Sequence, residues 1–198
     1  MNITQVTLEN SATVLILENV LPLNLLEQAQ NFCDTFSVDN PDWEPFGISR
    51  FIYQGSHPTY IKLKNYFESE LVMQKLNVAL RDQRLATSMF KIWVDLPGFG
   101  ALEPHVEIND AYIAQLFVTR KDHSYTGTTI YNRNKEILFQ LPYRNNCGWF
   151  FNNGSTVMHG RAHDVPEGVQ RFALMVWYSN EPEGDDLSKI RFKAATTT

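Results

Sequence analysis

The chain contains few cysteines: only Cys33 and Cys147 occur among its 198 residues. Their spacing matches neither a metal knuckle nor a redox Cys-x-x-Cys pair, so we expect both thiols to be reduced. No stretch is long and apolar enough to span a bilayer, and the first ten residues lack the basic and apolar segments of a signal peptide. These absences predict a soluble, cytoplasmic protein that makes no membrane contact.

Positive charge is also scarce. The 17 Lys and Arg residues are outnumbered by 22 Asp and Glu residues, which gives a formal net charge of −5 and a pI near 5.5. This balance argues against a broad electrostatic surface for nucleic acid. We therefore expect a small-molecule or peptide substrate and no nucleic-acid partner, while no feature of the sequence indicates an oligomeric state.

Internal repeats and low-complexity segments are likewise absent. With 43% apolar and 13% aromatic residues, the chain is long enough to bury one substantial core, and we expect a single domain. Helical patterns come first and short strands follow, which indicates the α+β class. We divide the domain into residues 1–86, helical support with a possible lid, residues 87–180, a jelly-roll core, and residues 181–198, a polar tail.

Hydrophobic periodicity predicts the individual elements. Apolar residues at helical spacing predict helices that begin near Asn24, Pro58 and Val72 and cover one outer face of a sheet. Asn24 and Glu27 match a capping box at the first of these helices. Alternating or apolar runs at jelly-roll spacing predict strands at 12–21, 87–96, 111–119, 127–131, 136–141, 148–151 and 171–178.

Residues 39–57 are rich in proline, glycine and aromatic side chains and follow no single period. We expect an ordered loop with a short strand at 49–53. One interpretation is a surface connection that packs Trp43 and Phe46 onto the helices. The alternative is a lid that closes over the functional site.

A His-x-Glu pair follows a Pro-Gly turn in the stretch LPGFGALEPHVEIND. Residues two apart on a strand face the same side, so His105 and Glu107 can both point at one ion. His159, which follows the turn NNGSTVM, would complete a set of two histidines and one carboxylate. That set is the facial triad of non-haem Fe(II) oxygenases, which leaves coordination positions open for chemistry. The alternative for His105 is a structural histidine.

A buried cation is expected beside this set. Arg171 begins the alternating run RFALMVWY, and its same-face neighbours are apolar. A buried guanidinium needs an anion, and its planar fork suits a carboxylate. The nearby acids are Asp164 and Glu167, which lie in a connecting loop. One interpretation is that Arg171 forms an internal salt bridge with one of them. A bound carboxylate ligand is the interpretation that we favour.

Through LPGFG, PHVE, NNGSTVMHG and RFALMVWYS, the chain resembles the Fe(II)- and 2-oxoglutarate-dependent oxygenases, particularly their compact prolyl-hydroxylase-like branch. The resemblance extends over residues 88–180. It implies a double-stranded β-helix, a jelly roll whose mouth holds the metal. It also implies that His105, Glu107 and His159 bind Fe(II), that Arg171 binds the distal carboxylate of 2-oxoglutarate as cosubstrate, and that O2 is the oxidant.

Two positions depart from the family pattern. The family more often has Asp where this chain has Glu107, and often has Ser or Thr where it has Ala173. The longer carboxylate would displace the metal or the backbone slightly, and the alanine removes one hydrogen bond to the cosubstrate. Tyr131 can add a hydroxyl contact to the cosubstrate, or it can pack as an aromatic core residue.

His163 competes with His159 for the role of second histidine ligand, because it lies only four residues further along the chain. We favour His159, since the turn before it resembles the family's approach to this histidine. His163 lies beside Asp164 in a polar loop, and its alternative role is that of a solvent-facing side chain.

The resemblance implies an enzyme that hydroxylates a small-molecule or peptidyl substrate, prolyl residues included, with release of succinate and CO2. Two other functions fit the same residues. One is a non-catalytic jelly-roll binding module. The other is a metal-dependent enzyme that does not use 2-oxoglutarate, in which Arg171 would bind a substrate anion. The identity of the substrate is not encoded in any motif.

Overall fold

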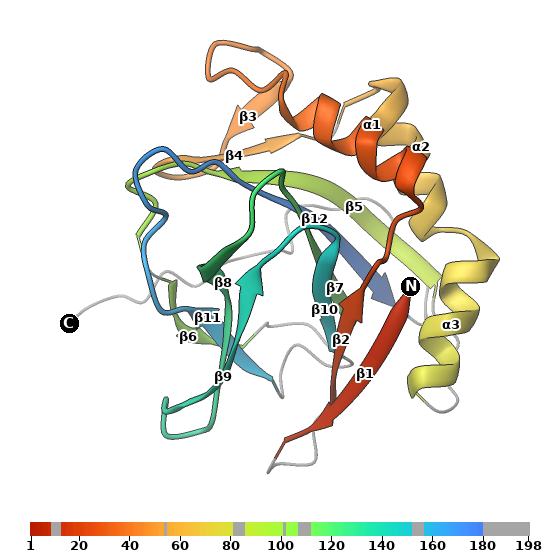
Figure 1. The fold of residues 1–198 in the computed structure, drawn as a ribbon, viewed down its shortest axis with the longest axis vertical. Coiled ribbons are helices and arrows are strands. Elements are labelled where there is room, and N and C mark those ends of the chain that lie inside the picture. Colours follow the sequence, from red (N-terminus) through yellow and green to blue (C-terminus); the bar gives the residue numbers. More distant parts are fainter. Residues whose placement is uncertain are drawn as a thin grey trace.

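The computed structural model describes residues 1–8, 13–53, 55–80, 86–100, 102–106, 112–151 and 157–179. These residues form two antiparallel sheets and three helices (Figure 1), which confirms the α+β class. The helices are α1 (Leu23–Cys33), α2 (Pro58–Phe67) and α3 (Glu70–Leu80). The strands are β1 (Asn2–Thr7), β2 (Thr13–Glu18), β3 (Trp43–Pro45), β4 (Arg50–Tyr53), β5 (Ala86–Asp95), β6 (Leu102–His105), β7 (Tyr112–Val118), β8 (His123–Tyr131), β9 (Ile137–Tyr143), β10 (Cys147–Phe151), β11 (Met158–Arg161) and β12 (Arg171–Ser179).

The larger sheet has the strand order β1-β2-β10-β7-β12-β5-β4-β3, and the smaller sheet has the order β6-β11-β8-β9. Side chains alternate between the two faces of each strand of the larger sheet. On β5, Phe90, Ile92 and Val94 point to a core beneath the helices, whereas Trp93 points to a second core between the two sheets. The functional residues described below belong to this second, inter-sheet face.

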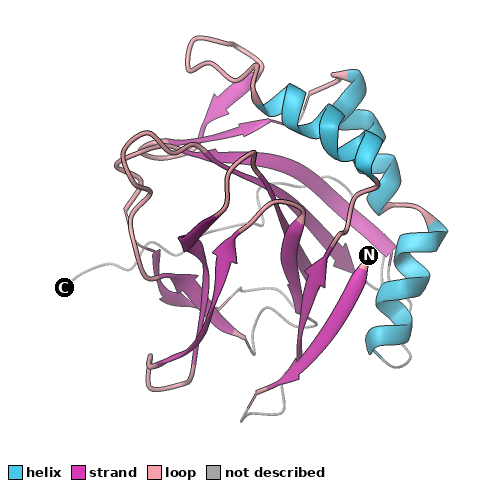
Figure 2. Cartoon of the chain, viewed as in Figure 1, coloured by secondary structure: helices cyan, strands magenta, loops and turns pink. Residues whose placement is uncertain are grey.

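The helices cover only the outer face of the larger sheet, as Figure 2 shows. Leu26 and Phe32 of α1 and Leu63 and Phe67 of α2 share one core with the outer-face side chains of the sheet. The apolar spacing of the sequence predicted these contacts. No helix among the described residues is long and apolar enough to cross a membrane.

The capping box predicted at the first helix does not form. The helix begins one residue earlier than expected, after Pro22, so Asn24 already lies inside the first turn. The side-chain oxygen of Asn24 accepts a hydrogen bond from the backbone N–H of Leu25, at 2.9 Å. At α2 a histidine takes the capping role, because Nδ1 of His57 accepts a hydrogen bond from the backbone N–H of Thr59 at 3.2 Å.

The first 53 residues also contribute four strands to the larger sheet, so residues 1–86 do more than provide helical support. β2 pairs with β10, where Leu15 lies opposite Phe150, and β1 pairs with the other edge of β2. The sequence analysis predicted β2 but missed β1. Most β1 side chains are exposed, so this edge strand has no strong alternating pattern to detect.

Much of the segment at 39–57 is sheet, because β3 and β4 form a hairpin at the edge of the larger sheet. Trp43 is buried and packs on Phe32 and Phe36, as one interpretation of the sequence predicted. Phe46 instead stacks on Trp93, on the other face, with ring centroids 6.2 Å apart. A lid made of the whole segment would have to break the core around Trp43. Within the segment, Phe46 and Ile48 are exposed, and a lid function for this turn stays a prediction.

Candidate metal centre and anion site

His105 and His159 lie side by side where two strands of the smaller sheet meet. β6 ends at His105, and His159 is the second residue of β11. The strand pairing places them directly opposite each other, and their ring centroids are 4.6 Å apart. Gly160 permits this approach, because a β-carbon there would collide with the backbone oxygen of Leu102 on β6. The structure thus brings together two of the predicted metal ligands.

Backbone carbonyl groups orient both imidazole rings. Nδ1 of His105 lies 2.8 Å from the carbonyl oxygen of Glu103, and Nδ1 of His159 lies 3.0 Å from that of Val157. A carbonyl oxygen can only accept a hydrogen bond, so Nδ1 carries the proton in each neutral ring and Nε2 carries the lone pair. Proteins commonly hold metal-ligating histidines in this way. The two rings therefore fit a metal ion that imidazole binds well, such as Fe(II) or Zn2+.

The two histidines differ in their access to solvent. His159 is buried, and its ring centroid lies 5.6 Å from that of Trp149 and 4.9 Å from that of Phe151. His105 is only partly buried. A metal ion held between them would be shielded by aromatic rings on the β10 side.

Glu107, the predicted carboxylate ligand, and its neighbour Asp110 lie outside the described residues. Among the residues that the structure does describe, no group of three His, Cys, Asp or Glu side chains can hold a metal ion. Among the described residues, the candidate metal ligands are therefore the two imidazoles. The role of Glu107 stays a prediction.

His163 lies apart from this pair. It follows the end of β11 and is exposed, and its backbone oxygen accepts a hydrogen bond from Nε of Arg161 at 2.8 Å. The strand pairing brings His159, and not His163, opposite His105. This geometry supports the choice of His159 as the second histidine.

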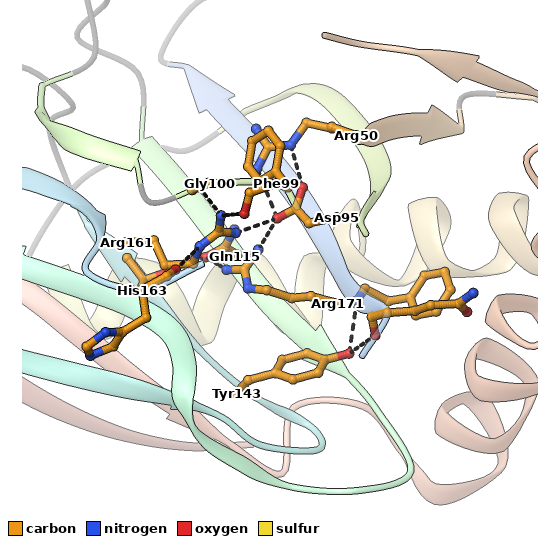
Figure 3. A network of polar contacts seen from close by, with 12 residues as sticks. Arg50, Asp95, Phe99, Gly100, Gln115, Tyr143, Arg161, His163 and Arg171 are labelled. Atoms are coloured by element: carbon orange, nitrogen blue, oxygen red, sulfur yellow. Dashed lines mark hydrogen bonds and ion pairs between the residues drawn. The ribbon is translucent and has the colours of Figure 1, made fainter. Parts of the chain in front are cut away.

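Arg171 has a protein partner that the sequence analysis missed. Its Nη1 donates to Oδ2 of Asp95 at 2.8 Å, and both side chains are buried (Figure 3). The partner is neither Asp164 nor Glu167, the nearby acids that the sequence offered. Asp95 is 76 residues away in the chain but directly opposite Arg171 across the β5 and β12 pairing. The carboxylate of Asp95 thus balances part of the positive charge of Arg171 without a bound ligand.

Two further arginines share the same carboxylate. Arg50 of β4 binds Asp95 with two groups, Nε to Oδ1 at 2.5 Å and Nη2 to Oδ2 at 3.0 Å. Arg161 of β11 reaches Oδ2 from the smaller sheet, with its Nη1 at 3.2 Å. Asp95 with these three arginines is called the Asp95 cluster below. Its charges are +3 from the guanidiniums and −1 from the carboxylate, which leave a net +2 in the protein interior.

The pKa values within the Asp95 cluster reflect this crowding. Burial alone would raise the pKa of Asp95, but the guanidiniums, Arg50 first, outweigh burial and hold that pKa below its usual value. Burial, followed by repulsion from Arg171, lowers the pKa of Arg161 to about 10. Burial also lowers the pKa of Arg171. A further anion beside the cluster would therefore be stabilised by its excess positive charge.

Aromatic rings and backbone oxygens hold the other two arginines in place. The guanidinium carbon of Arg50 lies 4.4 Å from the ring centroid of Trp93 and 4.2 Å from that of Phe99. Arg161 donates to the backbone oxygens of Phe99, at 2.7 Å, and Gly100. These contacts fix the guanidinium groups of Arg50 and Arg161 in position. Arg171 also reaches Gln115 with its Nη2, at a long 3.4 Å.

Gln115 on β7 connects Arg171 to the aromatic surroundings of His159. Its Oε1 accepts hydrogen bonds from Thr128 at 2.6 Å, from Nε1 of Trp149 at 3.0 Å and, at a long 3.4 Å, from Nη2 of Arg171. Trp149 in turn packs against His159. The candidate metal ligands and the Asp95 cluster are therefore parts of one continuous inter-sheet site.

No known family model and no curated protein sequence matches the chain. Solved structures do. A 2OG-Fe(II) oxygenase family oxidoreductase from Burkholderia pseudomallei matches with a TM-score of 0.64 and 8% identity, over 86% of each chain. The prolyl hydroxylase from Trichoplax adhaerens, solved with a fragment of hypoxia inducible factor, matches with a TM-score of 0.63 and 11% identity, over 84% of this chain and 83% of that one.

HygX from Streptomyces hygroscopicus, solved with nickel, 2-oxoglutarate and hygromycin B, matches with a TM-score of 0.56 and 13% identity, over 84% of this chain and 82% of that one. The chain has the fold of the Fe(II)- and 2-oxoglutarate-dependent oxygenases. The predicted double-stranded β-helix with supporting helices is thereby confirmed. At these identities the likeness concerns the fold alone, so the roles of residues must be argued from this chain.

Within this oxygenase fold, Tyr131 does not lie where the sequence analysis expected a cosubstrate contact. On β8, Ile130 pairs with His159, whereas Tyr131 pairs with Met158. Paired residues share a face, so Tyr131 leaves the strand on the side away from His159. The side chain is buried, which supports the alternative of core packing. Thr128, on the same face as Ile130, is the β8 residue that reaches the site through Gln115.

Sequence reasoning missed Arg50, Asp95, Gln115 and Arg161 as site residues of this oxygenase fold. The sequence did contain a feature that could have identified three of them, namely a polar or charged side chain within an apolar strand or next to a predicted ligand. Asp95 and Gln115 interrupt apolar strand patterns, and Arg161 lies two residues after His159 on the same strand. A charged or amide side chain on an apolar face needs a partner, and such residues can be searched for as a set.

Proposed function

We propose that the chain is an Fe(II)- and 2-oxoglutarate-dependent dioxygenase that hydroxylates a small-molecule or peptidyl substrate, prolyl residues included. The observation that carries the proposal is the pair His105 and His159, with Nδ1 of each ring held by a carbonyl oxygen, which places the lone pair of each neutral ring on Nε2. The shared fold supports the proposal.

His105, His159 and, by prediction, Glu107 would hold the iron. When bound, Fe(II) supplies the activation of O2 that C–H oxidation requires. The protein contributes orientation, since carbonyl groups fix both imidazoles, and exclusion of water, since Trp149 and Phe151 cover His159. HygX, with the same fold, was solved with nickel and 2-oxoglutarate, which supports both a divalent metal and this cosubstrate.

Arg171 and the net +2 charge of the Asp95 cluster would bind the distal carboxylate of 2-oxoglutarate. The guanidinium fork can serve two carboxylates at once, Asp95 on one edge and the ligand on another, because it carries five N–H donors. The overall reaction balances as substrate C–H, O2 and 2-oxoglutarate giving alcohol, succinate and CO2. One oxygen atom enters the alcohol and the other enters succinate.

One observation favours a second function, a metal-dependent enzyme that does not use 2-oxoglutarate. The 2.8 Å contact between Arg171 and Asp95 is what a purely structural ion pair would show. In that case the histidines would still bind metal, but Arg171 would contribute to folding and not to ligand binding.

Anaerobic titration with Fe(II) and 2-oxoglutarate distinguishes the two functions. Chelation of iron by 2-oxoglutarate should produce a visible charge-transfer band, because the facial triad leaves adjacent positions open. Succinate formation under O2 then tests turnover. A protein that binds Fe(II) but gives neither the band nor succinate would be assigned to the second function. A protein that binds no Fe(II) would be a binding module.

A further inference from the structure

Lys91 is a buried lysine on the inter-sheet face of β5. It alternates with Phe90 and Ile92, which belong to the core beneath the helices, and it shares its face with Trp93 and Asp95. Only 7% of the residue is exposed. Lysine is rarely buried to this extent without a partner.

The ammonium group of Lys91 makes no hydrogen bond or ion pair with any residue that the structure describes. Its pKa is lowered, chiefly because burial disfavours the charged form, and the acid that most counteracts this is the exposed Glu44 on β3. Glu44 lies beyond ion-pair distance. In contrast, the guanidiniums of the Asp95 cluster all have a carboxylate within 3.2 Å. Lys91 therefore differs from the other interior cations.

Strand register connects Lys91 with the aromatic surroundings of His159. Across the larger sheet, Lys91 lies opposite Met175, Met175 opposite Gln115, and Gln115 opposite Trp149. The ring of Trp149 packs against His159. Lys91 thus belongs to the row of side chains that ends at Trp149 beside His159, three strands away across the larger sheet.

Lys91 is also set apart along β5 from the Asp95 cluster. Asp95 contacts Arg161, which lies two residues beyond His159 on β11. Lys91 lies four positions before Asp95, or about 13 Å along the strand. An anion at Lys91 is therefore distinct from an anion held at Arg171, which lies opposite Asp95.

We propose that Lys91 binds an anionic group of the substrate, a carboxylate or a phosphate, and so selects a small anionic substrate whose oxidised carbon lies near the histidines. The assignment of substrate rests on the proposed function. The binding of an anion at Lys91 does not. The compact ammonium, with three donors, suits a single carboxylate or phosphate group.

The test uses inorganic phosphate and acetate as probes of the protein loaded with Mn(II) and saturating 2-oxoglutarate. Paramagnetic relaxation of the 31P and 13C signals reports an anion bound near the metal. We expect a saturable effect for at least one probe, and the more tightly bound probe identifies the substrate group. In Lys91→Met the affinity should fall about ten- to a hundredfold, as expected for loss of a charged hydrogen bond.

Lys62→Met is the matched control, because Lys62 is exposed on α2 and its ammonium binds Gln28. It should leave probe affinity unchanged. Lys91→Met should also leave the affinity for 2-oxoglutarate unchanged and should not lower the melting temperature, since methionine is close to lysine in length and removes a charge that burial disfavours. Lys91→Gln repeats the test if the methionine variant aggregates.

The outcomes separate the inference from the proposed function. Unchanged probe affinity in both Lys91 variants, or no saturable binding of either probe to the wild type, overturns the anion site. Weaker binding of 2-oxoglutarate in Lys91→Met would also overturn it, by assigning Lys91 to the cosubstrate. If the protein fails to bind Fe(II) and 2-oxoglutarate, the proposed function fails, and calorimetry of phosphate and acetate with metal-free protein still tests Lys91.

Discussion

Nη1 of Arg171 lies 2.8 Å from Oδ2 of Asp95, so the arginine assigned to a ligand carboxylate already contacts a carboxylate of the protein. The two residues pair across β5 and β12, and Arg50 and Arg161 contact the same aspartate. Asp95 therefore holds three like charges together and also sets the direction of the Arg171 fork. A cosubstrate would bind beside this ion pair and need not replace it.

Asp95→Asn should strongly destabilise the protein. Loss of the carboxylate leaves three buried guanidiniums without a counter-ion, and breaking a buried ion pair from one side typically costs about 3–5 kcal/mol. Urea unfolding at neutral pH measures the free energy of unfolding. Asp34→Asn is the control, because Asp34 pairs with Arg120 on the exposed surface, and little change is expected there. Equal stability of the two variants would contradict the structural role of Asp95.

Acid should remove the contribution of Asp95. Its pKa is lower in the folded protein than the ordinary value of 3.8, so its stabilisation is fully present above that ordinary value and is lost as the pH falls toward the folded pKa. The free energy of unfolding of the wild type should therefore fall below about pH 4. The difference between wild type and Asp95→Asn should shrink over the same range, and a constant difference would show that Asp95 does not titrate there.

Arg171→Ala should weaken the binding of 2-oxoglutarate about ten- to a hundredfold. The substitution removes the guanidinium that would donate hydrogen bonds to the distal carboxylate of 2-oxoglutarate. The charge-transfer band of the anaerobic iron complex measures this affinity. Iron binding in the absence of 2-oxoglutarate should be retained, since the arginine lies outside the ligand set. Arg120→Ala, on the surface, serves as control. Unchanged affinity in Arg171→Ala would favour the function without 2-oxoglutarate.

His159→Ala should abolish iron binding and turnover, whereas His163→Ala should retain most of both. His159 lies against His105, while His163 is exposed beyond the end of β11. Calorimetric titration with Fe(II) under nitrogen, followed by succinate measurement in air, compares the variants. The reverse pattern would transfer the ligand role to His163 and would require a different register between β6 and β11.

Glu107→Ala should eliminate coupled oxidation and weaken iron binding, and Asp110→Ala should change little. The sequence places Glu107 two residues after His105, and an extended chain would put both side chains on one face, whereas Asp110 belongs to a sequence typical of a turn, where Asn and Asp bond their own backbone. Metal affinity and succinate yield report the result. Full turnover in Glu107→Ala combined with loss in Asp110→Ala would transfer the role of the metal carboxylate to Asp110.

Local pattern was sufficient to predict much of this molecule. The alternation along β5 and β12, the helical spacing in α1 and α2, and the order of His105, His159 and Arg171 are properties of short segments, because each depends on residues a few positions apart. They led to the α+β class, and the resemblance to the oxygenase family that rests on the same short motifs implied the double-stranded β-helix and the choice of His159. The cytoplasmic location and the lack of a nucleic-acid partner rest on composition and stay predictions.

Only the tertiary structure decided which charges meet. Arg50, Asp95, Arg161 and Arg171 come from four strands of two sheets, and nothing in the local sequence around any one of them specifies the others. The strand register likewise turned Tyr131 away from the histidines and put Lys91 in the same row as Trp149, which packs against His159. A buried charge takes its properties from neighbours within a few ångströms, and those neighbours are set by sheet order and pairing, which the linear pattern does not contain.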